Sequence, residues 1–366
     1  MSENLFNTER YQRSLSNLGN PYRLLKLFEK AKRGEEITFA TIGGSITASC
    51  NASSWRKHYG CLIEDWFNAT FPEAKVNFKG AGIGATGSLV GVHRLDRDVL
   101  SANPDLVIVE LSVNDKPYAD NCQVYYDNLI YKTLNHKTAP AVLCIGTMGC
   151  DGINVQDKHI PVAKYYDLPF ISFRDSVWCE VESGALKWEQ ISNDSVHPID
   201  DGHKLMSDLV TTYFEGILDK SSKDYSDIKC DKPLTNLGFQ NGKLCYPNTL
   251  EAKDLGCFKI RDDINVNGLK IGWVAEENGA PLVIDFKDCH HLFLQFERTN
   301  KGDGGKAIAK VQGKEIMMDA DFTGGWGVYY NNTCVFDCET AQDVTLEITP
   351  DLKEGQHFTL VGILFS

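Results

Sequence analysis

The sequence predicts an α/β domain followed by an all-β domain, and three observations support this. Between residue 37 and about residue 218, apolar strands alternate with helical patterns, which is typical of a parallel sheet with helices on both faces. From about residue 229 to the end, short strands are separated by turn signals such as Asn241-Gly242 and Asn278-Gly279. With 366 residues, the chain is long enough for two domains of roughly 150 residues each.

The predicted parallel sheet has five strands, and each ends in small or polar residues. These strands are residues 37–42, 75–78, 105–111, 141–145 and 168–171. Their continuous apolar character is expected when helices cover both faces of a sheet. Apolar residues at helical spacing predict one helix before the first strand, at residues 22–32, and another after His203 that closes the domain.

The polar stretch 219–227 has no periodicity and is interpreted as a linker. We therefore expect a catalytic domain at residues 1–222 and a second domain at residues 229–366. Alternating runs such as 282–286 and 292–296 predict a jelly-roll sandwich for the second domain.

The charge balance and the absence of long apolar segments disfavour two classes of function for this sequence, namely nucleic-acid binding and membrane association. The 37 Lys and Arg against 50 Asp and Glu give a net charge of -13, which disfavours nucleic acid and anionic membrane surfaces as partners. The N-terminus lacks the pattern of a secretory signal, and no segment has the ~18 apolar residues that a membrane span needs. A cytoplasmic protein with reduced cysteines is expected.

Ser45 is the candidate nucleophile. It lies in Gly43-Gly44-Ser45, on a tight turn directly after the first strand, where open sheets present their reactive groups. A serine hydroxyl needs an adjacent base to become nucleophilic. The alternative is that Ser45 only caps the helix that follows.

Asp194 and His197 are the candidate partners of this serine. Three residues apart on a short turn, the carboxylate can hold one imidazole nitrogen and leave the other to accept a proton from serine. The alternative is a local turn contact without catalytic meaning.

An acyl-transfer site also needs donors for an oxyanion. The glycine-rich turn 80–87 offers backbone N–H groups after the second strand, and Asn114 offers a side-chain amide after the third. Each feature alone could simply shape a turn.

Together these pieces resemble the SGNH or GDSL-type serine hydrolases, whose Ser, Gly, Asn and His blocks occur in this chain order. The resemblance covers residues 20–220 and implies a flavodoxin-like parallel sheet. It implies Ser45, Asp194 and His197 as the catalytic triad, and the backbone N–H groups of Ser45 and Gly82 with the Asn114 side chain as the oxyanion hole. Gly44 stands where many members carry Asp, a departure shared with carbohydrate-active members.

The two-domain plan is similar to carbohydrate O-acetyl esterases of the acetylmannan and acetylxylan type. The resemblance implies removal of acetyl groups from mannan- or xylan-derived oligosaccharides, with the second domain acting as a carbohydrate-binding module. No cofactor is needed. In the second domain, Trp326 in a glycine-rich aromatic loop is the candidate substrate-binding residue, because sugar rings stack on such side chains. Alternatively, Trp326 is a core residue of the second domain. The sequence does not indicate the oligomeric state.

Three other functions are alternatives to a carbohydrate esterase. Gly82 to Gly87 also fits Gly-x-Gly-x-x-Gly, with Glu110 near the position of a ribose-binding acid, but a dinucleotide site leaves Ser45 and Asn114 unexplained. A lysophospholipase or thioesterase would call for an apolar lid segment that the sequence lacks. A non-catalytic carbohydrate-binding protein would not need an intact triad.

Two smaller expectations concern side-chain pairs. No metal site is expected, because His290 and His291 are adjacent on a strand and point to opposite faces. Arg94 and Asp98, four residues apart on a predicted helix, are interpreted as a surface ion pair.

Overall fold

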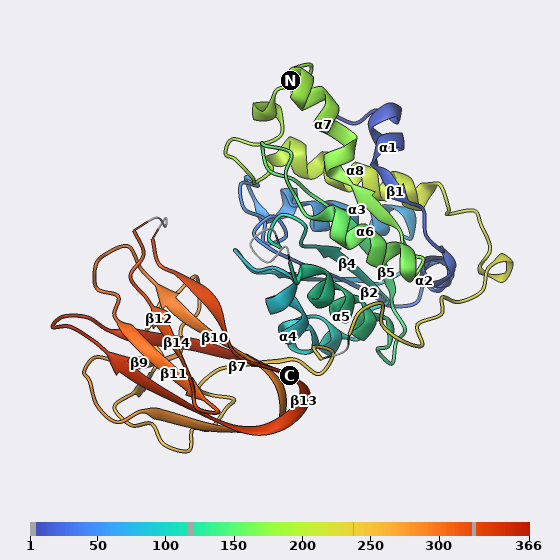
Figure 1. Cartoon of the computed structure of the whole chain (residues 1–366). Helices are drawn as coiled ribbons and strands as arrows, with labels where there is room; N and C mark the ends of the chain where they lie inside the picture. The colour runs from blue at the N-terminus through green and yellow to red at the C-terminus, as the bar shows by residue number, and fades with distance from the viewer. Residues whose placement is uncertain (1–4, 116–119, 237, 324–326) are drawn as a thin grey trace. The chain divides into compact units, whose positions relative to one another are not determined.

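The computed structural model describes residues 5–115, 120–236, 238–323 and 327–366. The chain forms two compact units, Met1–Gln240 and Asn241–Ser366 (Figure 1). Part of the segment that the sequence pattern places in the second domain packs on the first unit. There the Thr235 amide and hydroxyl each donate a hydrogen bond of 2.6 Å to the buried Asp127 carboxylate. The chain therefore stays attached to the first unit for some distance beyond residue 222.

The first unit is built on a six-stranded sheet in the order β1-β6-β5-β4-β2-β3. All neighbouring strands are parallel except β1, which runs antiparallel to β6. The five predicted strands are present, and the short edge strand β1 was not predicted. The strands are β1 (Leu15–Asn17), β2 (Ile37–Gly43), β3 (Val76–Gly82), β4 (Leu106–Glu110), β5 (Ala141–Gly146) and β6 (Phe170–Ser172).

The chain order reverses between β2 and β4, which are neighbours with β3 on the outer side of β2. In open parallel sheets, ligands bind at the carboxyl ends of the strands beside such a reversal. Ser45 follows β2 and Asn114 follows β4, so the fold brings both to this edge of the sheet.

Helices lie on both sides of this sheet (Figure 1). On one side α4 contacts α5 and α5 contacts α6, whereas α3 contacts α8 and α1 contacts α7. The α-helices are α1 (Thr8–Ser14), α2 (Tyr22–Lys32), α3 (Tyr59–Thr70), α4 (Ser88–Asp98), α5 (Cys122–Leu134), α6 (Gln156–Tyr165), α7 (Phe173–Ser183) and α8 (Asp200–Glu215). Single 3-10 turns occur at η1 (Trp55–Lys57), η2 (Leu100–Ala102), η4 (Trp188–Gln190) and η5 (Ser222–Asp224). The predicted α/β class is confirmed.

The second unit is all β, as predicted, and consists of a curled antiparallel sheet. Its order is β12-β11-β13-β10-β14-β9-β8, with β7 also paired to β14. Register shifts interrupt the pairing of the long strands β10 and β13, and such bulges bend a sheet. The strands are β7 (Lys243–Cys245), β8 (Lys259–Arg261), β9 (Gly272–Ala275), β10 (Leu282–Arg298), β11 (Lys306–Val311), β12 (Lys314–Asp319), β13 (Tyr329–Asp351) and β14 (Phe358–Phe365).

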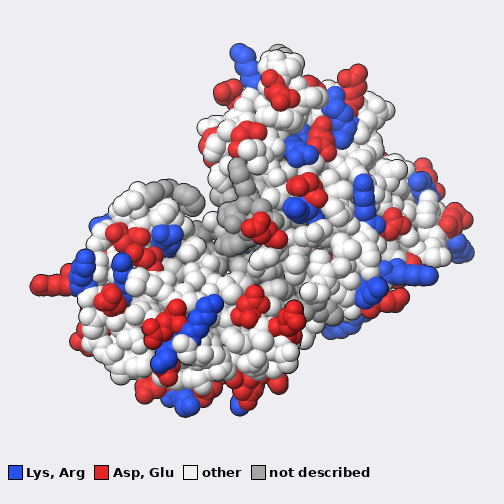
Figure 2. Space-filling model, viewed as in Figure 1, with Lys and Arg blue, Asp and Glu red and all other residues white. Residues whose placement is uncertain are grey.

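The curled sheet encloses its own apolar core, which includes the fully buried Trp273. On the face drawn in Figure 2, Lys and Arg side chains are dispersed among Asp and Glu. Within the described ranges, no helix has the length and apolar character needed to cross a bilayer.

Candidate active site

Ser45 lies on the turn that follows β2, and its hydroxyl faces a histidine. The Ser45 Oγ is 2.7 Å from His197 Nε2. The turn is closed by hydrogen bonds from the Ala48 amide to the Gly44 carbonyl and from the Cys50 amide to the Ser45 carbonyl. The next α-helix, α3, is capped by the side chain of His58 instead. The helix-capping alternative for Ser45 is therefore wrong.

Asp194 holds the other side of His197. The Asp194 Oδ2 is 2.8 Å from His197 Nδ1, and Oδ1 accepts hydrogen bonds of 2.7 Å from the amides of Val196 and His197. Partial burial would raise the pKa of Asp194, but these hydrogen bonds and the imidazole hold it well below its usual range. The ionised carboxylate can keep the imidazole proton on Nδ1, so that Nε2 is the proton acceptor for Ser45.

Three side chains that the sequence analysis did not identify support this pair. The amide of Asn51 donates to Asp194 Oδ2 at 2.9 Å and to the His197 carbonyl at 3.1 Å. Ser192 Oγ donates to the same carbonyl, and Trp188 Nε1 donates to the Asp194 carbonyl. Asn51 has a φ of 66°, a left-handed conformation that Asn adopts more readily than most residues. This preference of Asn for left-handed backbone is a local signal by which the sequence could have indicated Asn51.

Two glycines bring the predicted oxyanion donors against the Ser45 turn. Gly43 pairs in register with Gly82 on one side and with Glu110 on the other. A Cβ on Gly44 would lie 1.9 Å from Asn114 Oδ1, and a Cβ on Gly82 would lie 2.2 Å from the Ala48 amide nitrogen. Gly44 therefore makes room for the Asn114 side chain, and Gly82 lets β3 approach the turn.

A buried pair fixes the loop that carries Asn114. Asp115, the next residue, accepts a hydrogen bond of 2.6 Å from the Ser88 amide at the start of α4, and lies 2.9 Å from His159 Nε2 on α6. The Tyr126 ring stacks on His159 with centroids 3.7 Å apart. Helices α4, α5 and α6 thus all contribute to the position of this loop.

Two further groups near the turn are excluded from a direct role. Glu110 is fully buried and accepts hydrogen bonds from Thr147 Oγ1 at 2.6 Å and Thr47 Oγ1 at 3.0 Å. Burial raises its pKa, and it cannot reach a ribose, so the dinucleotide alternative loses its acidic residue. Burial also lowers the pKa of His203 to about 4, which makes His203 a poor base at neutral pH.

The prediction that Arg94 and Asp98 form an ion pair on the surface is wrong about the surface. The ion pair exists, with Arg94 Nη1 3.2 Å from Asp98 Oδ2, but the Arg94 side chain has no exposed area. It faces the sheet instead of solvent, because its guanidinium contacts the carboxyl ends of β2 and β3.

In the second unit, the predicted substrate residue Trp326 lies outside the described residues. Beside it in the sequence, the rings of Phe322 and Tyr329 are 5.7 Å apart, and the Arg298 guanidinium lies 4.0 Å from the Phe322 ring centroid. The role of Trp326 therefore stays a prediction.

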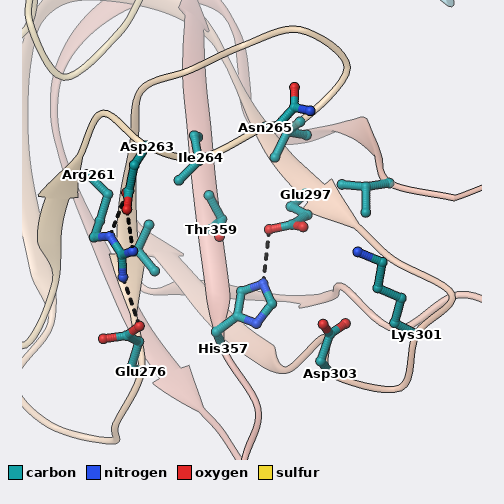
Figure 3. Close-up of a pocket in the computed structure, with 13 residues that line it drawn as sticks. Arg261, Asp263, Ile264, Asn265, Glu276, Glu297, Lys301, Asp303, His357 and Thr359 are labelled. Carbon is teal, nitrogen blue, oxygen red and sulfur yellow. Dashed lines mark hydrogen bonds and ion pairs between the residues drawn. The ribbon is translucent and has the colours of Figure 1, made fainter.

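A cavity of about 340 Å³ lies within the second unit (Figure 3). His357 Nε2 is 3.1 Å from Glu297 Oε2, and this hydrogen bond raises the pKa of His357 although burial opposes it. Lys301 and Asp303 lie around the same space, and apolar side chains complete it. The lining residues are Arg261, Asp263, Ile264, Asn265, Val266, Val274, Glu276, Glu297, Lys301, Asp303, Val328, His357 and Thr359.

The charges of this cavity suit a neutral ligand. Its four carboxylates outnumber Arg261, Lys301 and the His357 imidazole, whose pKa is raised, and Arg261 is already paired with Asp263 at 2.7 Å and Glu276 at 3.0 Å. An anionic ligand would face this acidic excess, whereas hydroxyl groups can bond to carboxylates and to ammonium groups alike. Among the described residues, no three His, Cys, Asp or Glu side chains are placed to hold a metal ion.

Comparisons with known proteins give a family match for the first unit and an overall structural likeness for the chain. Residues 41–205 match the GDSL-like Lipase/Acylhydrolase family. The whole chain is similar to the crystal structure of a two-domain esterase (CEX) active on acetylated mannans, with a TM-score of 0.89, 28% identity, and coverage of 97% of this chain and 98% of that one. The same esterase co-crystallised with mannopentaose gives a TM-score of 0.87 at 28% identity and the same coverage.

A second type of solved structure covers about half of the chain. The acetyl xylan esterase AlAXEase is 25% identical and covers 48% of this chain and 98% of its own length, with a TM-score of 0.40. No curated protein sequence matches the chain.

Proposed function

We propose that this protein is a serine esterase that removes O-acetyl groups from mannan-derived oligosaccharides, a function in keeping with the match of residues 41–205 to the GDSL-like Lipase/Acylhydrolase family. The observation that carries the proposal is the hydrogen-bonded chain from Ser45 through His197 to Asp194. The substrate class is supported by the likeness to the acetylmannan esterase, which extends over both units. Xylan-derived oligosaccharides are the second substrate class to test.

In the proposed mechanism, His197 accepts the Ser45 proton as the Ser45 Oγ attacks the ester carbonyl. Asp194 stabilises the imidazolium that forms. The negative charge on the carbonyl oxygen is bound by the backbone N–H groups of Ser45 and Gly82 and by the Asn114 amide.

The tetrahedral intermediate collapses by breaking the bond to the sugar oxygen, which takes the proton from His197. Ser45 is left as an acetyl ester. Water then attacks that ester with His197 again as the base, and acetate leaves as the free Ser45 is restored. The protein needs no redox step and no cofactor for this reaction.

Acetate release from acetylated manno- and xylo-oligosaccharides tests this proposal. We expect the intact chain to release acetate from the mannan-derived esters and the Ser45→Ala variant to lose this activity by at least about 10³-fold. A long-chain acyl thioester and a lysophospholipid serve as competing substrates. Faster turnover of either would replace the carbohydrate substrate class, whereas unchanged acetate release by Ser45→Ala would disprove the serine mechanism.

We further propose that the second unit binds the saccharide through the cavity of Figure 3. Its acidic excess and apolar walls fit a neutral, hydroxyl-rich ligand. Lys301→Met and Asp303→Asn should each raise the KM for the acetylated oligosaccharide while the KM for a small aryl acetate stays constant.

Lys310→Met is the matched control for the cavity, since Lys310 is an exposed lysine on β11 that does not line it. It should change neither KM. An oligosaccharide KM that is the same in all three variants and in the parent chain would show that the cavity does not bind the substrate.

A further inference from the structure

We propose that Arg94 is a positioning residue for the oxyanion-binding half of the site, acting through the two peptide groups to which it donates hydrogen bonds. This inference rests on the serine esterase function proposed above and extends it to a residue buried behind the site. Arg94 has no contact with the substrate in this proposal. Arg94 sets the geometry and the polarity of the backbone groups that contact the substrate.

The contacts of the guanidinium are specific. Arg94 Nη1 donates to the Ala81 carbonyl at 2.8 Å, and Nη2 donates to the Gly43 carbonyl at 3.0 Å. These carbonyls lie at the carboxyl ends of two adjacent strands, β3 and β2. The guanidinium therefore ties together the two strand ends from which the glycine-rich turn and the Ser45 turn begin.

The Ala81 contact acts directly on a predicted oxyanion donor. The carbonyl of Ala81 and the N–H of Gly82 belong to one planar peptide group, in which C=O and N–H point in opposite directions. A cation that binds the carbonyl oxygen withdraws electron density from this group and makes its N–H a stronger donor. The Gly82 N–H thus points away from Arg94 and is strengthened by it.

The Gly43 contact acts on the peptide group just before the nucleophile. The Gly43 carbonyl shares its peptide plane with the Gly44 N–H, and it also accepts a hydrogen bond of 3.1 Å from the Ile83 amide. Gly44 adjoins both Ser45 and the Asn114 side chain. Fixing this plane limits how the Ser45 turn can move relative to the Gly82 turn.

Burial makes these contacts strong, and the shape of the guanidinium suits them better than an ammonium group would. The Arg94 side chain has no exposed area, so its hydrogen bonds operate in a medium of low dielectric constant. Two diverging N–H groups are needed to reach two carbonyls on different strands, and lysine has a single ammonium nitrogen. Asp98 supplies a compensating negative charge, because its Oδ2 accepts a hydrogen bond of 3.2 Å from the same Nη1 that donates to the Ala81 carbonyl.

The test compares kcat for an aryl acetate in Arg94→Met and Arg94→Lys with kcat in the parent chain. Rates are expressed per Ser45 that reacts with an organophosphorus ester, so that unfolded protein is not counted. We expect Arg94→Met to lower kcat about 10- to 100-fold, less than the loss of a direct oxyanion donor, with KM changed by less than about twofold. Arg94→Lys should recover part of this loss.

A second buried arginine provides the control that separates this role from a purely structural one. Arg10 is another buried arginine, which donates to the Leu5 carbonyl and pairs with Glu180 in α7. Arg10→Met should lower the melting temperature without changing kcat, because it removes no bond to the Ala81 or Gly43 carbonyl and no contact of the Arg94 guanidinium.

The proposal is overturned if Arg94→Met keeps the parent kcat, or if Arg10→Met loses as much. Where Arg94→Met does not fold, Arg94→Lys decides, and a kcat equal to that of the parent chain overturns the proposal. The serine mechanism is judged separately, since its failure shows as activity in Ser45→Ala whatever happens at Arg94.

Discussion

The two halves of the proposed site, one for proton transfer and one for binding the oxyanion, are held in place by different means. The proton-transfer half consists of Asp194 and His197, three residues apart, whose contacts are mostly within one turn. The anion-binding half combines the ends of β2, β3 and β4 and depends on close packing at Gly44 and Gly82. The contacts between Asp194 and His197 are encoded locally, with the distant Asn51 as an added support, whereas the sheet assembles the anion-binding half. Substitutions in the two halves should therefore have different consequences.

The largest effect is expected from Asp194→Asn in the proton-transfer half. The neutral amide removes the acceptor that fixes the His197 tautomer, and kcat should fall by about 10⁴-fold. KM for an aryl acetate should change little. Steady-state kinetics at neutral pH measure both, and a loss of less than tenfold would mean that His197 does not need its carboxylate.

Asn114→Ala breaks the anion-binding half without touching His197. The loss of one oxyanion donor should lower kcat by about 10²- to 10³-fold. The reaction of Ser45 with an organophosphorus ester should slow as well, because that reaction also develops charge on an oxygen. A rise in KM alone would place Asn114 in ground-state binding instead.

Asn51 tests how much the proton-transfer half depends on a supporting hydrogen bond. Asn51→Gly keeps the left-handed backbone at no steric cost and removes the amide that donates to Asp194 and the His197 carbonyl. We expect kcat to fall about tenfold, within the range for loss of a hydrogen bond to a charged group. Ser49→Gly is the control, since Ser49 has a φ of 68° in the same turn, and it should leave kcat unchanged.

The smallest effect concerns stability against pH. The pKa of Asp194 is lowered in the folded state, so its ionised form stabilises the fold above the unfolded-state pKa of about 3.9. This contribution is lost as pH falls below that value. The Asp194 side chain is 41% exposed, and solvent keeps the contribution small.

Urea denaturation of the parent chain and Asp194→Asn at about pH 6 and about pH 3 checks this expectation. The difference in unfolding free energy between the two proteins should shrink at the lower pH. A difference that stays the same would show that Asp194 is not stabilised as a carboxylate.

The halves also differ in how far the sequence could predict them. Ser45 at a strand end and the Asp194 and His197 pair are short patterns, and the structure brings these three side chains together. Asn51 was missed because its partner Asp194 is 143 residues away. The sequence analysis placed Arg94 on the surface because its four-residue spacing from Asp98 suits a surface ion pair equally well. Only the tertiary fold buries its guanidinium against the carboxyl ends of β2 and β3.

The fold class followed from patterning, while other features depended on packing. Gly44 departs from the Asp that many SGNH hydrolases carry there, and the structure explains the glycine by the Asn114 side chain that fills its space. The edge strand β1 has three residues, too few for a periodic pattern to reveal it.

The central claim is that Ser45 is the nucleophile activated by His197. Reaction of the intact chain with an organophosphorus ester, followed by mass spectrometry of its peptides, tests this claim most directly. We predict one phosphoryl group on Ser45, complete loss of esterase activity in proportion to labelling, and a much slower reaction in His197→Ala. Labelling of another residue in step with the loss of activity, or full inhibition with Ser45 unmodified, would contradict it.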